Sequence, residues 1–250
     1  MRHRIRWWFL PVAALLIVLA GALVWGYTPR GPAPEALAAL RSDEQIRVQT
    51  RPWLVFEPVA AATDAVGLIL YPGGRVDARS YAPVARDIAR EGYRVAIVPM
   101  PLNLAVLGPE RATRVIQAYP SVERWVVGGH SLGGAMAARY AHSHVDGVQG
   151  LVLWASYPPA SSDLSSSDLA VTSIYATEDG LATADKIATY RELLPPKTRW
   201  VPIKGGNHAQ FGAYGEQPRD GEASIDAAEQ RRRIVQATVA LLEQVALATP

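Results

Sequence analysis

The sequence predicts an α/β fold, in which helices cover both faces of a mainly parallel central sheet. Short apolar runs, typical of strands buried on both faces, alternate along the chain with amphipathic helical segments. Glycine-rich or polar segments follow several of these runs, where ligands bind in such sheets. The 250 residues suffice for one domain with a large core, and 49% of them are hydrophobic, which argues against disorder.

The first 27 residues predict an N-terminal membrane anchor or signal peptide. Arginines at positions 2, 4 and 6 precede an uncharged apolar stretch at residues 7–27, long enough to cross a lipid bilayer as a helix. Aromatic residues at both ends of the stretch favour the membrane interfaces, and the arginines favour a cytoplasmic N-terminus. We therefore expect a single-pass protein of the cell membrane with an extracytoplasmic domain. Residues 20–22 also resemble a cleavage site, and cleavage would give a secreted protein.

Residues 28–44 are expected to form a proline-rich, extended linker with a short helix near residues 35–41, and residues 45–250 the globular domain. The domain is expected to begin with two strands, at residues 45–50 and 53–56, which could pair as a hairpin.

Strands and helices alternate through the rest of the domain. Continuous apolar runs predict strands, and they lie at residues 65–71, 93–98, 124–127, 148–155, 170–176 and 198–203. Apolar residues at helical spacing predict helices, at residues 80–91, 110–119, about 184–194 and 222–247, with another directly after the glycine-rich turn that follows residue 127. Gly92 is expected to end the first of these helices.

Composition excludes several classes of function. The chain has no cysteine, which excludes disulfides, thiolate metal sites and a cysteine nucleophile. The formal net charge is only +2, and the N-terminal arginines account for more than this excess, so we expect no nucleic-acid partner. The run Arg231–Arg233 is expected to be a solvated helix face. No residue pattern implies a metal or an organic cofactor.

The segment Gly129-His130-Ser131-Leu132-Gly133 matches G-x-S-x-G, the pattern of a nucleophile elbow. In such a turn the serine backbone is strained, and glycines are needed where the strand and helix approach closely. The N–H of Leu132 would bind the oxyanion at the helix N-terminus. The motif alone is weak because glycine and serine are common, but the predicted strand before it and helix after it favour the elbow.

His208 is the candidate base, since it follows the last predicted strand and the other four histidines lie elsewhere. His130 is expected to point away from the nucleophile. The candidate acid is Asp179, which follows a strand and lies between the serine and the histidine in the chain. Glu178 competes with it, although the turn character of Asp179-Gly180 favours the aspartate. Alternatively, Asp179 could only cap its turn, and His208 could only bind the backbone of its loop.

The remaining candidates lie in loops at the same edge of the sheet. Gly74 is the candidate for the second oxyanion donor, with Arg75 next, although the segment could be a simple Pro-Gly turn. Leu102 and Leu104, in an apolar loop, and Phe211, beside the candidate base, are candidates for a hydrophobic substrate pocket. Packing against other loops is an equal alternative for these three.

The chain resembles α/β-hydrolases, and more narrowly the compact bacterial family related to dienelactone hydrolases. Five blocks carry the resemblance, in this order: 71–74, 99–104, 129–134, 177–180 and 206–212. It covers about residues 45–247 and implies a Ser131–Asp179–His208 triad. True dienelactone hydrolases use a cysteine nucleophile, so their substrate does not carry over. Members with large lids insert a domain after the sixth strand, and residues 157–169 are too few for one.

Together these observations predict a serine hydrolase that cleaves small-molecule carboxylic esters through an acyl-enzyme, tethered outside the cytoplasmic membrane. Other acyl hydrolysis or acyl transfer on the same triad, with lipid or peptide substrates, is one alternative. A non-catalytic surface binding protein is another. The acyl group, the alcohol and the oligomeric state stay open.

Overall fold

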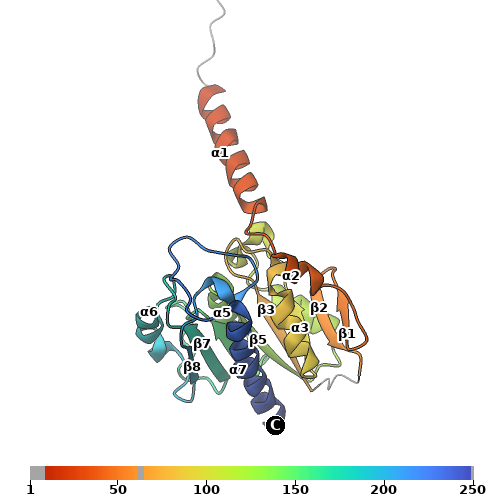
Figure 1. The fold of residues 1–250 in the computed structure, drawn as a ribbon. Helices are drawn as coiled ribbons and strands as arrows, with labels where there is room; N and C mark the ends of the chain where they lie inside the picture. The colour runs from red at the N-terminus through yellow and green to blue at the C-terminus, as the bar shows by residue number, and fades with distance from the viewer. Residues whose placement is uncertain (1–8, 61–64, 249–250) are drawn as a thin grey trace, which may run out of the picture.

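The computed structural model describes residues 9–60 and 65–248, whose strands form one eight-stranded sheet in the order β1-β2-β4-β3-β5-β6-β7-β8 (Figure 1). The strands are β1 (Ile46–Gln49), β2 (Leu54–Pro58), β3 (Val66–Tyr71), β4 (Arg94–Ile97), β5 (Arg124–His130), β6 (Gly150–Trp154), β7 (Ala170–Ala176) and β8 (Arg199–Ile203).

The sheet is mainly parallel, as the sequence predicts. β1 and β2 form an antiparallel hairpin and β2 pairs antiparallel with β4, whereas the other neighbours pair in parallel. All side chains of β3 and β6 are buried, because helices cover both faces of a parallel sheet. The carboxyl ends of β3, β5, β7 and β8 therefore meet at one edge, which we call the catalytic rim.

Helices pack on both faces of the sheet (Figure 1). α3 (Ala82–Arg90) and α7 (Ala227–Leu247) contribute to one hydrophobic core, whereas α4 (Arg111–Ala118) and α5 (Leu132–Ser143) contribute to the other. Gly92, with φ of 100°, follows α3 as expected. The connection from β6 to β7 holds no helix, so no lid domain covers the rim there. The α/β-hydrolase type of fold expected from the sequence is thus the one observed.

Two helices are shorter than expected. α6 spans only Ala184–Thr189 and is followed by a 3-10 turn at Arg191–Leu193. α7 begins at Ala227 because the side chain of Asp226 caps it, accepting a hydrogen bond from Glu229 N–H at 2.7 Å. The residues just before α7 are not helical, and Ser224 N–H donates to the backbone oxygen of Gly205 instead.

The apolar N-terminal helix α1 (Phe9–Tyr27) projects from the domain (Figure 1). Among the described residues it alone is long and apolar enough to cross a membrane, over Leu10–Tyr27, and almost all of that span is exposed. The next residues lie against the domain rather than standing free: Arg30 N–H donates to Arg75 O at 2.8 Å, and Ala33 N–H to Ala213 O at 2.8 Å. The short helix α2 (Pro34–Ala38) follows.

Candidate active site

Ser131 lies in the sharp turn between β5 and α5, in a strained conformation. Its φ of 52° and ψ of −122° fall in a region that residues other than glycine rarely adopt. Ser131 N–H donates to the backbone oxygen of Trp154 at 2.9 Å, and the Ser156 hydroxyl donates to the backbone oxygen of Ser131 at 2.7 Å. The end of β6 and the loop after it therefore hold the strained turn in place.

Close approach of the backbone explains two glycines of the turn. A Cβ atom added to Gly129 would lie 2.5 Å from the backbone oxygen of Tyr71, and one added to Gly133 would also collide with that oxygen. Any side chain at either position would push β5 or α5 away from the end of β3. The steric requirement inferred from the sequence is confirmed.

His208 and Asp179 lie in contact at the catalytic rim. His208 Nδ1 is 2.7 Å from Asp179 Oδ2, and both side chains are buried. The second carboxylate oxygen accepts hydrogen bonds from the N–H groups of Leu181 and Ala182, each at 2.7 Å. The carboxylate that contacts the imidazole is thus that of Asp179, whereas Glu178, its competitor, accepts a hydrogen bond from the adjacent Thr177 hydroxyl.

Asp220, which the sequence analysis did not single out, holds the acid and base loops together. Its carboxylate accepts hydrogen bonds from the N–H groups of His208 at 3.1 Å, Ala209 at 2.7 Å and Gly180 at 3.2 Å. The buried side chain of Gln230 on α7 also binds the base loop, through both backbone groups of Asn207. These contacts fix the backbone that carries the histidine, and no sequence motif predicts them.

Ser131 and His208 line one pocket of about 270 Å³ at the catalytic rim. Its other lining residues are mostly apolar or small: Leu132, Ala135, Ala155, Ser156, Tyr157, Leu181 and Ala182. In the described part of the chain no hydrogen bond joins the Ser131 hydroxyl to the His208 ring. Catalytic hydrogen bonds are often long without substrate and tighten when it binds. The three candidate side chains therefore gather at one rim, the serine and the histidine facing a shared space.

The hydrogen bonds of the loop after β3 show which of its N–H groups could bind an oxyanion beside Leu132. In the loop after β3, Gly73 N–H donates to the Tyr81 hydroxyl at 2.9 Å and Arg75 N–H to Asn103 O at 2.8 Å. Within the described residues Gly74 N–H has no such partner, and a Cβ on Gly74 would lie 3.2 Å from the side chain of Leu132. The geometry favours Gly74 over Arg75 as the second donor.

The three candidate substrate residues lie elsewhere. Leu102 contacts the end of α1, where a Cβ added to Gly26 would meet it at 2.8 Å. Leu104 is partly buried beside it in the chain and does not line the pocket of Ser131. Phe211 is buried behind the site and stacks on the ring of His130 at 5.5 Å. The structure brings none of the three to the pocket, because their loops pack against other segments.

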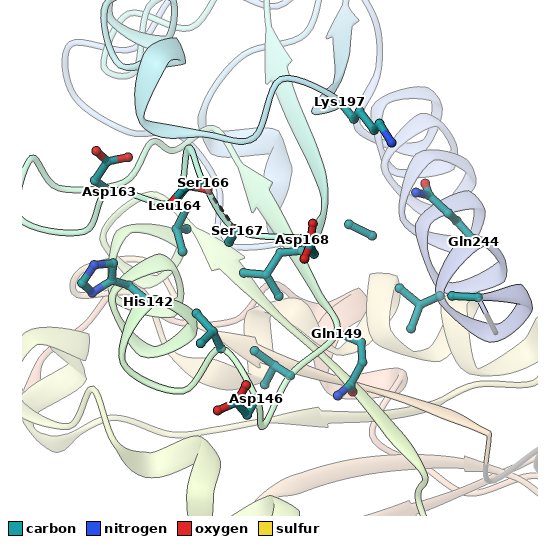
Figure 2. A pocket seen from close by; sticks show the side chains of 16 residues that line it. His142, Asp146, Gln149, Asp163, Leu164, Ser166, Ser167, Asp168, Lys197 and Gln244 are labelled. Carbon is teal, nitrogen blue, oxygen red and sulfur yellow. Dashed lines mark hydrogen bonds between the residues drawn. The ribbon is translucent and has the colours of Figure 1, made fainter. Parts of the chain in front are cut away.

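A wider recess of about 850 Å³ lies at the opposite edge of the sheet (Figure 2). Figure 2 shows Asp163, Asp168, Lys197 and Gln244 spread around it rather than converging on one point. None of the candidate catalytic residues lines it. Among residues 9–60 and 65–248, no group of three or more histidine, aspartate or glutamate side chains could hold a metal ion. The pocket that Ser131 and His208 line at the catalytic rim is therefore the candidate active site.

Comparison with known protein families decides the classification. The model of the alpha/beta hydrolase family matches residues 67–232, which is most of the domain. The chain belongs to this family. Membership identifies the protein as a hydrolase, and it leaves the substrate and the narrower relation to dienelactone hydrolases open. No curated protein matches the chain.

Solved structures share the α/β-hydrolase fold. One is described as a "predicted CIB-like hydrolase" from Thermoplasma acidophilum, with 15% identity and a TM-score of 0.55 over 78% of this chain and 98% of that chain. Another is the esterase domain of a Rhodothermus marinus protein, with 11% identity and a TM-score of 0.58 over 80% of this chain and 96% of that chain. At these identities the likeness concerns the fold alone.

His130 of this α/β-hydrolase packs against the candidate base. The centres of the two rings lie 4.4 Å apart, and His130 Nδ1 is 2.8 Å from the Tyr81 hydroxyl oxygen. Because that hydroxyl accepts the N–H of Gly73, its own proton is free to bind His130 Nδ1. His130 thus supports both His208 and the loop that carries Gly74, a role that the sequence analysis, which expected only that the ring points away from the nucleophile, did not assign.

We expect His130 to make the fold sensitive to acid. Burial, and then the neighbouring His208, lower the pKa of His130 well below its usual value of 6.5. Below pH 6.5 the unfolded chain therefore binds a proton that the native state does not, so stability is full above pH 6.5 and falls as the pH drops. At pH 5.5 this linkage costs on the order of 1 kcal/mol.

Urea unfolding of the full chain and of His130→Phe in detergent, at pH 7.5 and 5.5, measures this loss. The parent is expected to lose more stability than the variant between the two pH values, by on the order of 1 kcal/mol. Equal losses in the two proteins would show that His130 does not cause the sensitivity.

Proposed function

We propose that this protein is a serine esterase, tethered outside the cytoplasmic membrane, that hydrolyses carboxylic esters through an acyl-enzyme. The observation that carries the proposal is the buried contact of 2.7 Å between His208 Nδ1 and Asp179 Oδ2. The same imidazole faces the pocket that Ser131 lines. A strained serine, a histidine and a carboxylate in these relations are the parts that nucleophilic acyl transfer needs.

In the first half-reaction the Ser131 oxygen bonds to the ester carbonyl carbon while His208 Nε2 takes the hydroxyl proton. The carbonyl oxygen becomes an oxyanion, which the N–H groups of Leu132 and Gly74 stabilise together with the N-terminus of α5. When the intermediate collapses, the bond to the alcohol oxygen breaks. The alcohol leaves with the proton from His208, and the acyl group stays on Ser131.

In the second half-reaction a water molecule attacks the acyl carbon. His208 takes one proton of the water and returns it to the Ser131 oxygen as the acid leaves. The sum is ester plus water to carboxylic acid plus alcohol, so neither a redox partner nor a metal is needed. Asp179 holds His208 in the tautomer with Nδ1 protonated and stabilises the imidazolium that forms in each half-reaction.

The sequence before and within α1 supports the location. Three arginines precede the apolar helix and favour a cytoplasmic N-terminus, which would put the hydrolase domain on the outer side. A cleaved signal peptide would also export the domain. Labelling of intact cells with a membrane-impermeant amine reagent tests the location, and protection of the domain's lysines would contradict it.

A substrate panel tests the reaction type. The full chain in detergent is expected to hydrolyse p-nitrophenyl acetate faster than matching p-nitroanilides, with EDTA having no effect. His142→Gln is a matched control, since His142 lies in the last turn of α5, far from Ser131. Preferential transfer of the acyl group to added alcohols would favour an acyltransferase instead. No turnover of any ester would favour a non-catalytic binding protein and contradict the proposal.

A further inference from the structure

The C-terminal end of α1, which we call its foot, is bound to the loops that flank the candidate oxyanion hole. The Arg75 side chain donates to the backbone oxygens of Trp25 at 3.1 Å and Thr28 at 2.7 Å, and its guanidinium lies 4.1 Å from the centre of the Trp25 ring. Asn103 Nδ2 donates to the backbone oxygen of Gly26 at 2.9 Å. Arg75 directly follows Gly74, so α1 meets the domain at the catalytic rim.

The chain between α1 and the domain is too short to let the rim move away from the helix end. α1 ends at Tyr27, and Arg30 already pairs with Val76 of the domain. Three residues span at most about 11 Å even when fully extended. If α1 crosses the bilayer, its last residues lie at the outer interface, and the catalytic rim is held within about this distance of the lipid headgroups.

Exposed apolar side chains gather around the same foot. Leu37 on α2 is 46% exposed, and Val106 and Leu107, in the loop that also carries Asn103, are 48% and 52% exposed. Figure 1 shows α2 beside the foot of α1. This loop is the apolar segment expected from the sequence to wall the pocket. Its leucine and valine tips instead face outward, where contact with acyl chains would bury them.

We propose that the catalytic rim faces the outer leaflet of the membrane, with Val106 and Leu107 in contact with lipid, and that the substrate is an acyl ester of an amphiphile resident in that leaflet. The substrate part of this inference rests on the proposed esterase function. The pocket of about 270 Å³ takes the ester group and its nearest carbons, while the rest of the amphiphile stays in the bilayer. Leu132 and Tyr157 supply apolar walls for that end.

Site-specific labelling tests the orientation without relying on catalysis. The chain has no cysteine, so Leu107→Cys offers a single site for a fluorophore. Val145→Cys is the matched control, because Val145 is 47% exposed and lies at the opposite edge of the sheet. In phosphatidylcholine vesicles with nitroxide-bearing lipid, we expect at least a threefold stronger quenching of the label at residue 107. Equal quenching at the two sites would overturn the proposed orientation.

Paired substrates test the substrate class. 4-Methylumbelliferyl oleate dissolved in phosphatidylcholine vesicles and 4-methylumbelliferyl acetate in water release the same product. With the full chain in these vesicles, Val106→Asp combined with Leu107→Asp is expected to lower oleate hydrolysis about tenfold and to leave acetate hydrolysis unchanged. Val145→Asp combined with Leu247→Asp, two exposed apolar positions at the far edge, should change neither rate.

The outcomes separate the two proposals. Unchanged oleate hydrolysis in the Val106 and Leu107 double variant, or an equal fall in both rates, would overturn the membrane-resident substrate and leave the esterase intact. If the parent hydrolyses neither ester, the proposed function is contradicted instead. The quenching comparison would still decide the orientation.

Discussion

Replacing Ser131 with alanine is expected to lower kcat for ester hydrolysis about 10⁶-fold. The change removes the attacking oxygen and leaves the turn in place, because the N–H bond to Trp154 and the bond from Ser156 involve only the backbone of residue 131. The residual rate should come from oxyanion stabilisation and substrate binding alone. The measurement is steady-state hydrolysis of p-nitrophenyl acetate, with the folded state of the variant checked by circular dichroism.

A second serine variant controls for the substitution itself. Ser167 lies at the opposite edge of the sheet, where its hydroxyl donates to the backbone oxygen of Leu164. Ser167→Ala should keep the activity of the parent. A folded Ser131→Ala variant with more than about one hundredth of the parental rate would contradict the nucleophilic role, given the expected loss.

Replacing Asp179 with asparagine is expected to lower kcat about 10⁴-fold with little change in the fold. The asparagine oxygen can still accept the N–H groups of Leu181 and Ala182, which keeps the turn. Its amide NH₂ then faces His208 Nδ1 and donates to it, so the imidazole proton moves to Nε2. His208 can no longer accept the proton of Ser131. The pH profile of kcat, compared with that of the parent, measures the loss.

Glu178→Gln is the matched control for the acid, since this neighbouring carboxylate accepts a hydrogen bond from the Thr177 hydroxyl, whereas it is Asp179 that contacts His208. Its activity is expected to stay within about twofold of the parent, as for surface changes that remove no catalytic contact. If Glu178→Gln shows the large loss and Asp179→Asn does not, the assignment of the acid is reversed.

The sequence predicts the fold well because its signals are local. The strands of a parallel sheet are buried on both faces, so they stand out as apolar runs between amphipathic helices. The topology also makes the order of the functional segments informative: β5, β7 and β8 end at one rim, and Ser131, Asp179 and His208 follow these strands. Their catalytic roles stay predictions that the variants above test.

The supporting contacts could not be predicted because they join distant segments. Alternation along β5 puts His130 on the same face as Val126, but nothing in the sequence shows that the base loop returns to meet its ring. Asp220 likewise closes two loops that are separated by a strand and a helix. Phe211 and Leu102 look like pocket residues because they are apolar and near the rim, and only packing reveals their actual partners.

The central claim is that His208 activates the Ser131 hydroxyl, and covalent trapping tests it most directly. A fluorophosphonate reacts with activated serines and stays attached. After trypsin digestion of the labelled full chain, the adduct should appear on peptide 125–139, whose only hydroxyl side chain is that of Ser131. Labelling should be lost in His208→Gln. An unlabelled peptide 125–139 from folded protein, or an adduct on a different serine, would contradict the account.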